Sequence, residues 1–253
     1  MKGEKRAGRS QGGQAQEQLA LFQEKKRGGK RRGAGRPPKG RRSSSPHKVR
    51  PFHHARFPVH VVLRVIDEVG SLRRHCAYRA IREATFTTAR RENFRIVHIS
   101  LQRNHVHLIV EADHKEALSS GMQGFQISAA KHLNAEISKG RPGPRRRGTV
   151  FVDRYYAVPI TSPRQARHAL SYVMGNWRKH EEDRIPGFSE WKVDWYSSGP
   201  VFPDWDEYGD QSFLMPYPPN YDPLLVYRPR TWLLREGWKK SGPISYRAVP
   251  SAS

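Results

Sequence analysis

The fold of this chain is decided by residues 99–111, which read ISLQRNHVHLIVE. Because side chains of a strand alternate between its two faces, His105 and His107 project from one face and Val106 and Leu108 from the other. A structural histidine pair is the ordinary interpretation of such a pattern taken alone. Two imidazoles at the start of an otherwise apolar strand also have a geometry suited to binding a metal ion.

A second stretch, residues 163–177, reads PRQARHALSYVMGNW and predicts a helix that begins after a serine cap, with a proline in its first turn. Tyr172 and Asn176 are four residues apart and therefore share one face of this helix. A histidine pair, a phenol and a carboxamide indicate metal-assisted attack of Tyr172 on a phosphodiester. The spacing leaves Tyr155 and Tyr156 open as alternative nucleophiles.

The ligand types also limit the metal ion. Imidazoles with an amide oxygen from Asn176 and open positions for phosphate favour Mg²⁺ or Mn²⁺, although the ligands alone would also accept zinc. Histidines without a partner at the same spacing are expected to be surface or structural residues: His53, His54, His60, His98, His114, His132 and His168.

Regular secondary structure is expected from residue 57 onward. The apolar patterns predict strands at 59–66, 94–101, 105–111 and 149–160, and helices at 71–91, 115–137 and 163–177. Ser71 is the expected N-cap of the first helix. The order β-α-β-β-α-β-α predicts an α+β fold: a ferredoxin-like split β-α-β antiparallel sheet with an added helix that carries the tyrosine.

Composition divides the chain into three parts: a disordered basic tail (1–50), the folded domain (51–184) and a Trp- and Pro-rich extension (185–253). The tail has 16 Lys and Arg against three acidic residues and too few apolar residues to offset its ordering entropy. Its Gly35-Arg36-Pro37 core resembles an AT-hook, so Arg36 is a candidate minor-groove contact. The extension has too many aromatic residues for a disordered tail, and a short helix is expected at 231–240.

The formal net charge of +23 favours a polyanionic partner, most simply DNA. The basic loop residues Arg145, Arg146 and Arg147 are candidate phosphate contacts. No apolar stretch approaches the roughly 20 residues that span a bilayer, so a membrane is not an expected partner. Cys76 is the only cysteine, which excludes an intrachain disulfide and cysteine-cluster zinc sites.

Four segments, in order, resemble the single-tyrosine HUH transposases, where HUH denotes His-hydrophobic-His: 104–111 (NHVHLIVE), a helix of the 122–134 type, 150–156 (VFVDRYY) and 169–176 (ALSYVMGN). The sequence is most similar to the REP-associated tyrosine transposases and related bacterial elements of the insertion-sequence two-hundred type, over about residues 57–183. This resemblance implies that His105, His107 and Asn176 hold a divalent metal ion. It also implies that Tyr172 attacks single-stranded, hairpin or repeat DNA, giving a 5′-phosphotyrosine and a free 3′-OH.

The chain departs from this family at two positions of the tyrosine helix. Trp177 stands where relatives often have proline, and Asn176 stands where many have glutamine. The resemblance implies a protein of the bacterial cytoplasm, associated with the nucleoid, and leaves a homodimer open. Two alternatives are a domesticated, non-catalytic DNA-binding protein and a histidine-triad nucleotide hydrolase, which needs a third histidine where Ile109 stands.

Overall fold

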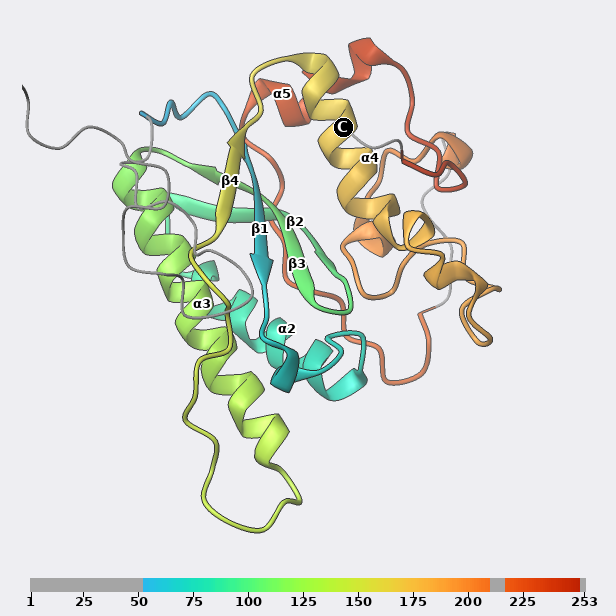
Figure 1. Ribbon diagram of the computed structural model, residues 1–253. Coiled ribbons are helices and arrows are strands. Elements are labelled where there is room, and N and C mark those ends of the chain that lie inside the picture. The colour runs from blue at the N-terminus through green and yellow to red at the C-terminus, as the bar shows by residue number, and fades with distance from the viewer. Residues whose placement is uncertain (1–51, 210–216, 251–253) are drawn as a thin grey trace, which may run out of the picture. The chain divides into compact units, whose positions relative to one another are not determined.

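The computed structural model describes residues 52–209 and 217–250, all within one compact unit, Ser45–Ser253 (Figure 1). The strands are β1 (Val59–Arg64), β2 (Phe94–Leu101), β3 (His105–Ala112) and β4 (Tyr156–Pro159). The α-helices are α2 (His75–Ala89), α3 (Lys115–Ser138), α4 (Pro163–Lys179) and α5 (Trp232–Arg235). Short 3-10 helices in the described residues are η1 (Asp67–Val69), η2 (Glu182–Arg184), η3 (Gly199–Val201), η4 (Asp206–Tyr208) and η5 (Gly237–Ser241).

The four strands form one antiparallel sheet in the order β2-β3-β1-β4 (Figure 1). In its central row, Val62 of β1 lies opposite His107 of β3 and also opposite Tyr156 of β4. With α2 after β1 and α3 after β3, this order is the split β-α-β arrangement of ferredoxin-like folds. The fold class predicted from the sequence is confirmed.

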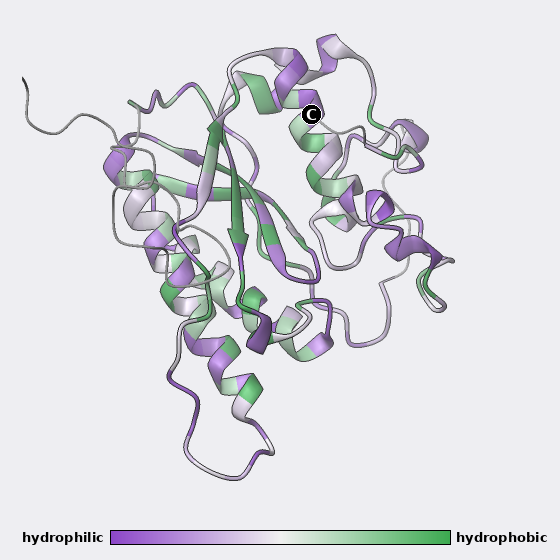
Figure 2. Cartoon of the chain, viewed as in Figure 1, coloured by the Kyte–Doolittle hydropathy of each residue, from purple (hydrophilic) through white to green (hydrophobic). Residues whose placement is uncertain are grey.

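Helices α2 and α3 cover one face of the sheet and form the main core with it. Val61, Val106 and Leu108 point into this core and are fully buried, and the strands are correspondingly apolar (Figure 2). Gly121 lets α3 approach β2, because a Cβ atom at this position would lie 2.2 Å from the ring of Phe94. Any larger residue would push the helix away from the sheet.

Helix α4 packs on the opposite face, through a second apolar cluster. Its start is as the sequence predicts: Ser162 Oγ accepts a hydrogen bond from the backbone N–H of Gln165 (3.3 Å), and Pro163 is the first helical residue. The cluster contains Val97, Ile109, Ile160, Ala166, Leu170, Val173, Met174, Val193, Phe202, Trp205, Leu233, Leu234, Trp238 and Ile244. Val97 reaches this face because the β2–β3 register shifts between residues 96 and 98.

The chain after α4 is held against the sheet by buried ion pairs and by backbone hydrogen bonds. Arg73 donates from both terminal nitrogens to the two carboxylate oxygens of Asp194, each at 2.9 Å, and both side chains are buried. Buried Glu111 accepts hydrogen bonds from the backbone N–H groups of Arg230 (2.8 Å) and Thr231 (2.8 Å). These bonds satisfy buried charges that would otherwise be costly.

The same extension covers the outer edge of β2. Backbone N–H groups of Leu101 and Tyr227 bond to the carbonyls of Tyr196 (2.8 Å) and Ile96 (2.9 Å). An edge strand exposes unpaired peptide groups, and here the extension supplies their partners. Three tryptophans of this region, Trp195, Trp205 and Trp238, are buried in the same packing, whereas Trp232 is 51% exposed.

The predicted start of the first helix is wrong. Ser71 does not cap the first helix: α2 begins at His75, and Ser71 Oγ accepts instead from the backbone N–H of Arg73 (3.2 Å). The reason is a tertiary contact, since the N–H of Leu72 donates to the carbonyl of Arg103 (2.8 Å). That bond and the full burial of Leu72 hold the segment before α2 out of the helix.

The strand predicted at 149–160 is interrupted. Val152 N–H bonds to the carbonyl of Arg64 (2.9 Å), but the chain then bends where the carboxylate of Asp153 accepts from the N–H of Arg154 (2.7 Å). Regular pairing resumes only in β4. The predicted helix at 231–240 is also divided, into α5 and η5, because Glu236 has φ −130° and ψ −38°.

Candidate active site

The site begins with the two histidines of β3, on the sheet face opposite the main core. His107 is 4% exposed, and His105 is half-buried at the start of the strand. The ring centroids of His105 and His107 are 4.7 Å apart. The alternation predicted from the sequence therefore places both imidazoles on the face that α4 partly covers.

A third histidine joins them from β1. His60 Nε2 lies 3.1 Å from His107 Nδ1, within hydrogen-bond distance, and the two rings are stacked. The sequence predicts that His60 lacks a partner, because His60 and His107 are 47 positions apart and meet only through strand pairing.

Helix α4 brings Tyr172 to these rings. The Tyr172 ring centroid is 5.2 Å from that of His107 and 6.0 Å from that of His60. Lys179 places its Nζ atom 5.0 Å from the Tyr172 ring centroid. A positive charge over this ring attracts a phosphate group toward the phenol.

Asn176 lies on the same helical face, one turn after Tyr172 and one turn before His180. The His180 ring centroid is 5.8 Å from that of His105, so this face of α4 runs along the histidine pair. Asn176 is fully buried, and neither atom of its amide group has a hydrogen-bond partner among the described residues; the same is true of His107 Nε2. Buried polar atoms without partners are rare in folded proteins.

The unpartnered atoms of Asn176 and His107 are the test of whether the residues present suit a metal ion. An amide oxygen and a neutral imidazole nitrogen are both metal ligands, and a bound cation would satisfy each of them. Between residues 52 and 250, leaving out 210–216, no group of three or more His, Cys, Asp or Glu side chains could hold a metal ion. A metal site in this part of the chain would need a ligand of another type, and the unpartnered amide oxygen of Asn176 is a candidate.

Burial controls protonation at the site. It lowers the pKa of His60 and of His105 to about 4, and burial together with the neighbouring imidazoles lowers the pKa of His107 to about 2. All three rings are therefore neutral at pH 7, which is the form that binds metal ions. Burial also raises the pKa of Tyr172, so its hydroxyl group carries a proton before any reaction.

Residues 54–176 match the sequence model of a family described as "Transposase IS200 like". This part of the chain belongs to the IS200-like transposase family. Two solved structures are similar to the transposase chain: a REP-associated tyrosine transposase bound to a REP hairpin, and a proposed transposase from Deinococcus radiodurans R1. The first is 14% identical, with a TM-score of 0.45, and the similarity covers 61% of this chain and 82% of the other. The second is 11% identical, with a TM-score of 0.32, and coverage is 56% and 97%.

Among curated proteins, none matches the transposase sequence at a significant level. Within the described residues, no helix of the transposase is long and apolar enough to cross a membrane.

The two alternative nucleophiles, Tyr155 and Tyr156, have surroundings that differ from those of Tyr172. The ring of Tyr155 is part of the main core and is 9% exposed, so it is on the side of the sheet away from the histidines. Tyr156 is 69% exposed on β4. Among these three tyrosines, ring contacts with the histidines of the site are made by Tyr172.

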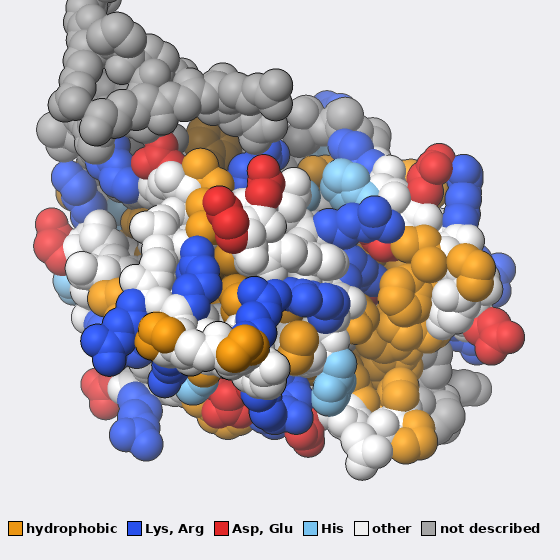
Figure 3. All heavy atoms as spheres, turned by 60° about the horizontal axis from the view of Figure 1, so that its bottom comes forward, with side chains coloured by type: hydrophobic (Ala, Val, Ile, Leu, Met, Phe, Trp, Pro, Cys, Tyr) orange, Lys and Arg blue, Asp and Glu red, His pale blue; other side chains and the backbone are white. Residues whose placement is uncertain are grey.

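The three loop arginines that the sequence predicts as phosphate contacts differ from one another in their surroundings. Arg145 donates to the carbonyl of Lys131 (2.7 Å), and Arg146 bonds to Asn134 and to the carbonyl of Thr149 (2.8 Å), so both brace their own loop. Arg147 is exposed. Lys and Arg side chains are spread over the face at this end of the sheet (Figure 3). Arg36 lies outside the described residues.

Two arginines of α4 are also used internally. Arg167 donates to the carbonyl of Pro243 (2.6 Å) and Arg178 to that of Tyr246 (2.8 Å). They attach the C-terminal segment of the transposase to α4.

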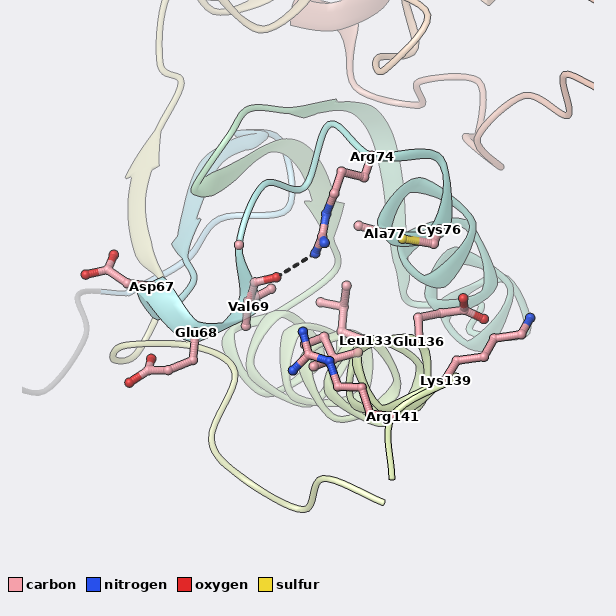
Figure 4. Close-up of a pocket in the computed structure, with 12 residues that line it drawn as sticks. Asp67, Glu68, Val69, Arg74, Cys76, Ala77, Leu133, Glu136, Lys139 and Arg141 are labelled. Atoms are coloured by element: carbon pink, nitrogen blue, oxygen red, sulfur yellow. Dashed lines mark hydrogen bonds between the residues drawn. The ribbon is translucent and has the colours of Figure 1, made fainter. Parts of the chain in front are cut away.

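A separate pocket of about 280 Å³ lies between η1, the start of α2 and the end of α3 (Figure 4). Cys76 lines it, in agreement with the prediction of a partly buried cysteine on a helix. Arg74 crosses the pocket wall to donate to the carbonyl of Val69 (2.8 Å). No histidine of the transposase site lines this pocket.

Proposed function

We propose that this transposase cleaves and rejoins single-stranded DNA, with Tyr172 as the nucleophile. The observation that carries the proposal is the 5.2 Å separation between the Tyr172 and His107 rings, which brings a phenol from α4 to the histidine pair of β3. Attack of the phenol oxygen on a scissile phosphate forms a Tyr172–phosphorus bond and breaks the bond to the 3′ oxygen. The phenol loses its proton, and the departing 3′ oxygen gains one.

His105, His107 and Asn176 are the residues that would hold a divalent cation, Mg²⁺ or Mn²⁺. When bound, such an ion would polarise the scissile phosphate and orient it for attack. The protein's own contribution is to keep the imidazoles neutral through burial and to hold the amide of Asn176 one turn from the nucleophile. Lys179 adds positive charge beside the phenol.

The proposed substrate is hairpin or repeat DNA with a single-stranded segment at the scissile phosphate. The net charge of +23 supports binding to a polyanion. The covalent phosphotyrosine conserves the energy of the broken ester, so a 3′-OH from a second strand can displace it and restore a phosphodiester without a nucleotide cofactor.

A labelled-substrate assay tests the proposal. Single-stranded and hairpin oligonucleotides of varied sequence, labelled on the 3′ side of each candidate cleavage site, are incubated with the protein and Mn²⁺. We expect a denaturation-resistant adduct that is absent with Tyr172→Phe and with EDTA. Tyr217→Phe is the matched control, because Tyr217 is 49% exposed on the extension and takes no part in the site. DNA binding without an adduct under every condition would instead indicate the non-catalytic alternative.

A further inference from the structure

The sheet face that carries His105 and His107 continues across β1 onto β4, where one aromatic ring is exposed. Tyr156 lies opposite Val62, and Val62 lies opposite His107. Directly paired residues of antiparallel strands point to the same face. Ala157 packs against the main core on the other face, which confirms by alternation that Tyr156 and Val158 share the face of the histidines.

This part of the face is open. Tyr156 is 69% exposed and Val158 39% exposed, although α4 buries the neighbouring region at Ile109. Within residues 52–209 and 217–250, no aromatic ring or cationic side chain packs on the Tyr156 ring, which is exposed to solvent. Exposed aromatic rings serve as stacking surfaces for bases in proteins that bind single-stranded nucleic acids.

The distance from this ring to the site suits one nucleotide. Adjacent strands lie about 4.8 Å apart, so the backbone of Tyr156, two strands from His107, is about 10 Å away from it. When a phosphate is bound at His107 and Tyr172, the sugar and base next to it therefore lie above β1 and β4. The base would meet the Tyr156 ring.

A positive charge completes the surface. Arg64 is exposed, lies opposite His105, and therefore points to the same face two residues along β1 from Val62. A cation beside an exposed aromatic ring is the combination that single-stranded nucleic-acid sites use, the cation for the backbone and the ring for a base. Duplex DNA offers no free base face at this position.

We propose that Tyr156 is a stacking platform for the unpaired base next to the scissile phosphate, with Val158 extending the platform and Arg64 binding the adjacent backbone. The inference rests on the proposed function for the location of that phosphate. It assigns to Tyr156, whose ring is not among those that contact the site histidines, a role in selecting single-stranded over duplex DNA.

Fluorescence anisotropy of the full chain with a labelled single-stranded 20-nucleotide probe tests this in EDTA, where no cleavage interferes. We expect Tyr156→Ala to weaken binding about tenfold, and Tyr156→Trp to restore it, because loss of one stacked base has an effect of this size. The ratio of wild-type to variant affinity should stay constant as salt rises, since the ring is uncharged, while both affinities fall. Binding of the matching duplex should not change.

Phe86→Ala is the matched control, because Phe86 is a 41% exposed aromatic residue on α2, among the helices of the other sheet face. Equal single-strand affinity of Tyr156→Ala and wild type would overturn the inference, even if the Tyr172 adduct forms normally. Loss of affinity with Tyr156→Ala but no adduct in the wild type would uphold the platform and reject the cleavage mechanism. An equal loss on the duplex would contradict the inference.

Discussion

His60 Nε2 and His107 Nδ1 are 3.1 Å apart, and only one of these two nitrogens can carry the shared proton. His107 Nε2, which is buried and otherwise unpartnered, has a free lone pair only when His107 Nδ1 carries that proton and His60 Nε2 accepts it. In that arrangement His60 holds the tautomer of His107 that can bind a cation. Hydrogen-bonded partners of this kind orient metal-binding histidines in general.

This relationship predicts the effect of changes at His60. His60→Leu removes the acceptor and should weaken Mn²⁺ binding about 10- to 100-fold, the usual effect of losing such a partner. His60→Gln keeps an acceptor oxygen and should recover much of the affinity. Calorimetric titration with Mn²⁺ measures both, and equal affinities of His60→Leu and wild type would show that the hydrogen bond does not orient His107.

Asn176→Leu should separate stability from activity. The substitution replaces a fully buried amide that has no partner in the described residues with an apolar side chain of similar size. Removing an unsatisfied buried polar group should raise the free energy of unfolding by about 1 kcal/mol or more. Urea denaturation in EDTA should show this gain while adduct formation is lost; a less stable variant would mean that the amide has a structural partner.

Stability should depend on pH through His98. Burial lowers the pKa of His98 to about 4, and its Nδ1 atom lies 3.1 Å from the hydroxyl of Ser198, which accepts from the N–H of Ile99. The unfolded chain binds the proton near pH 6.5 but the folded protein resists it. The neutral His98 ring therefore contributes its full stabilisation above pH 6.5. As the pH falls toward 4, the free energy of unfolding decreases by about 3 kcal/mol.

His98→Asn tests this assignment, because its side-chain oxygen can accept the same hydrogen bond without titrating. Unfolding free energies of the two proteins, measured from pH 7 to pH 4, should diverge, with the wild type losing more stability. Parallel curves would place the acid sensitivity at other groups.

The buried pair of Arg73 and Asp194 should be essential for attachment of the extension. Asp194→Ala removes the bidentate partner of the buried Arg73 guanidinium group and leaves it with the more distant carboxylate of Glu182, 3.7 Å away, which costs up to about 3–5 kcal/mol. Urea denaturation should show this loss. Arg184→Ala is the control, because Arg184 pairs with Glu181 on the surface and such pairs contribute less than about 1 kcal/mol.

Much of the site follows from local sequence. The alternation around His105 and His107 fixes their shared face, and the Ser162 cap with Pro163 fixes the start of the helix that carries Tyr172 and Asn176. These features depend on residues close together in the chain. Local physical chemistry is therefore sufficient to predict them.

The missed features are long-range. His60 becomes a partner of His107 only when β1 and β3 pair in one particular register. The bonds of Arg167 and Arg178 to the C-terminal segment depend on a docking that no periodicity records. The strand at 149–160 is broken by a side-chain-to-backbone bond at Asp153, which apolar alternation does not reveal.

The central claim, that Tyr172 is the residue joined to DNA, is tested most directly by mass spectrometry of the trypsin-digested adduct. Cleavage after Arg167 and Arg178 yields the peptide HALSYVMGNWR, whose only tyrosine is Tyr172, while Tyr155 and Tyr156 fall together in YYAVPITSPR. The account predicts a nucleotide joined through its 5′ phosphate to the first peptide, on Tyr172. The same mass addition on the second peptide, or on neither, would contradict it.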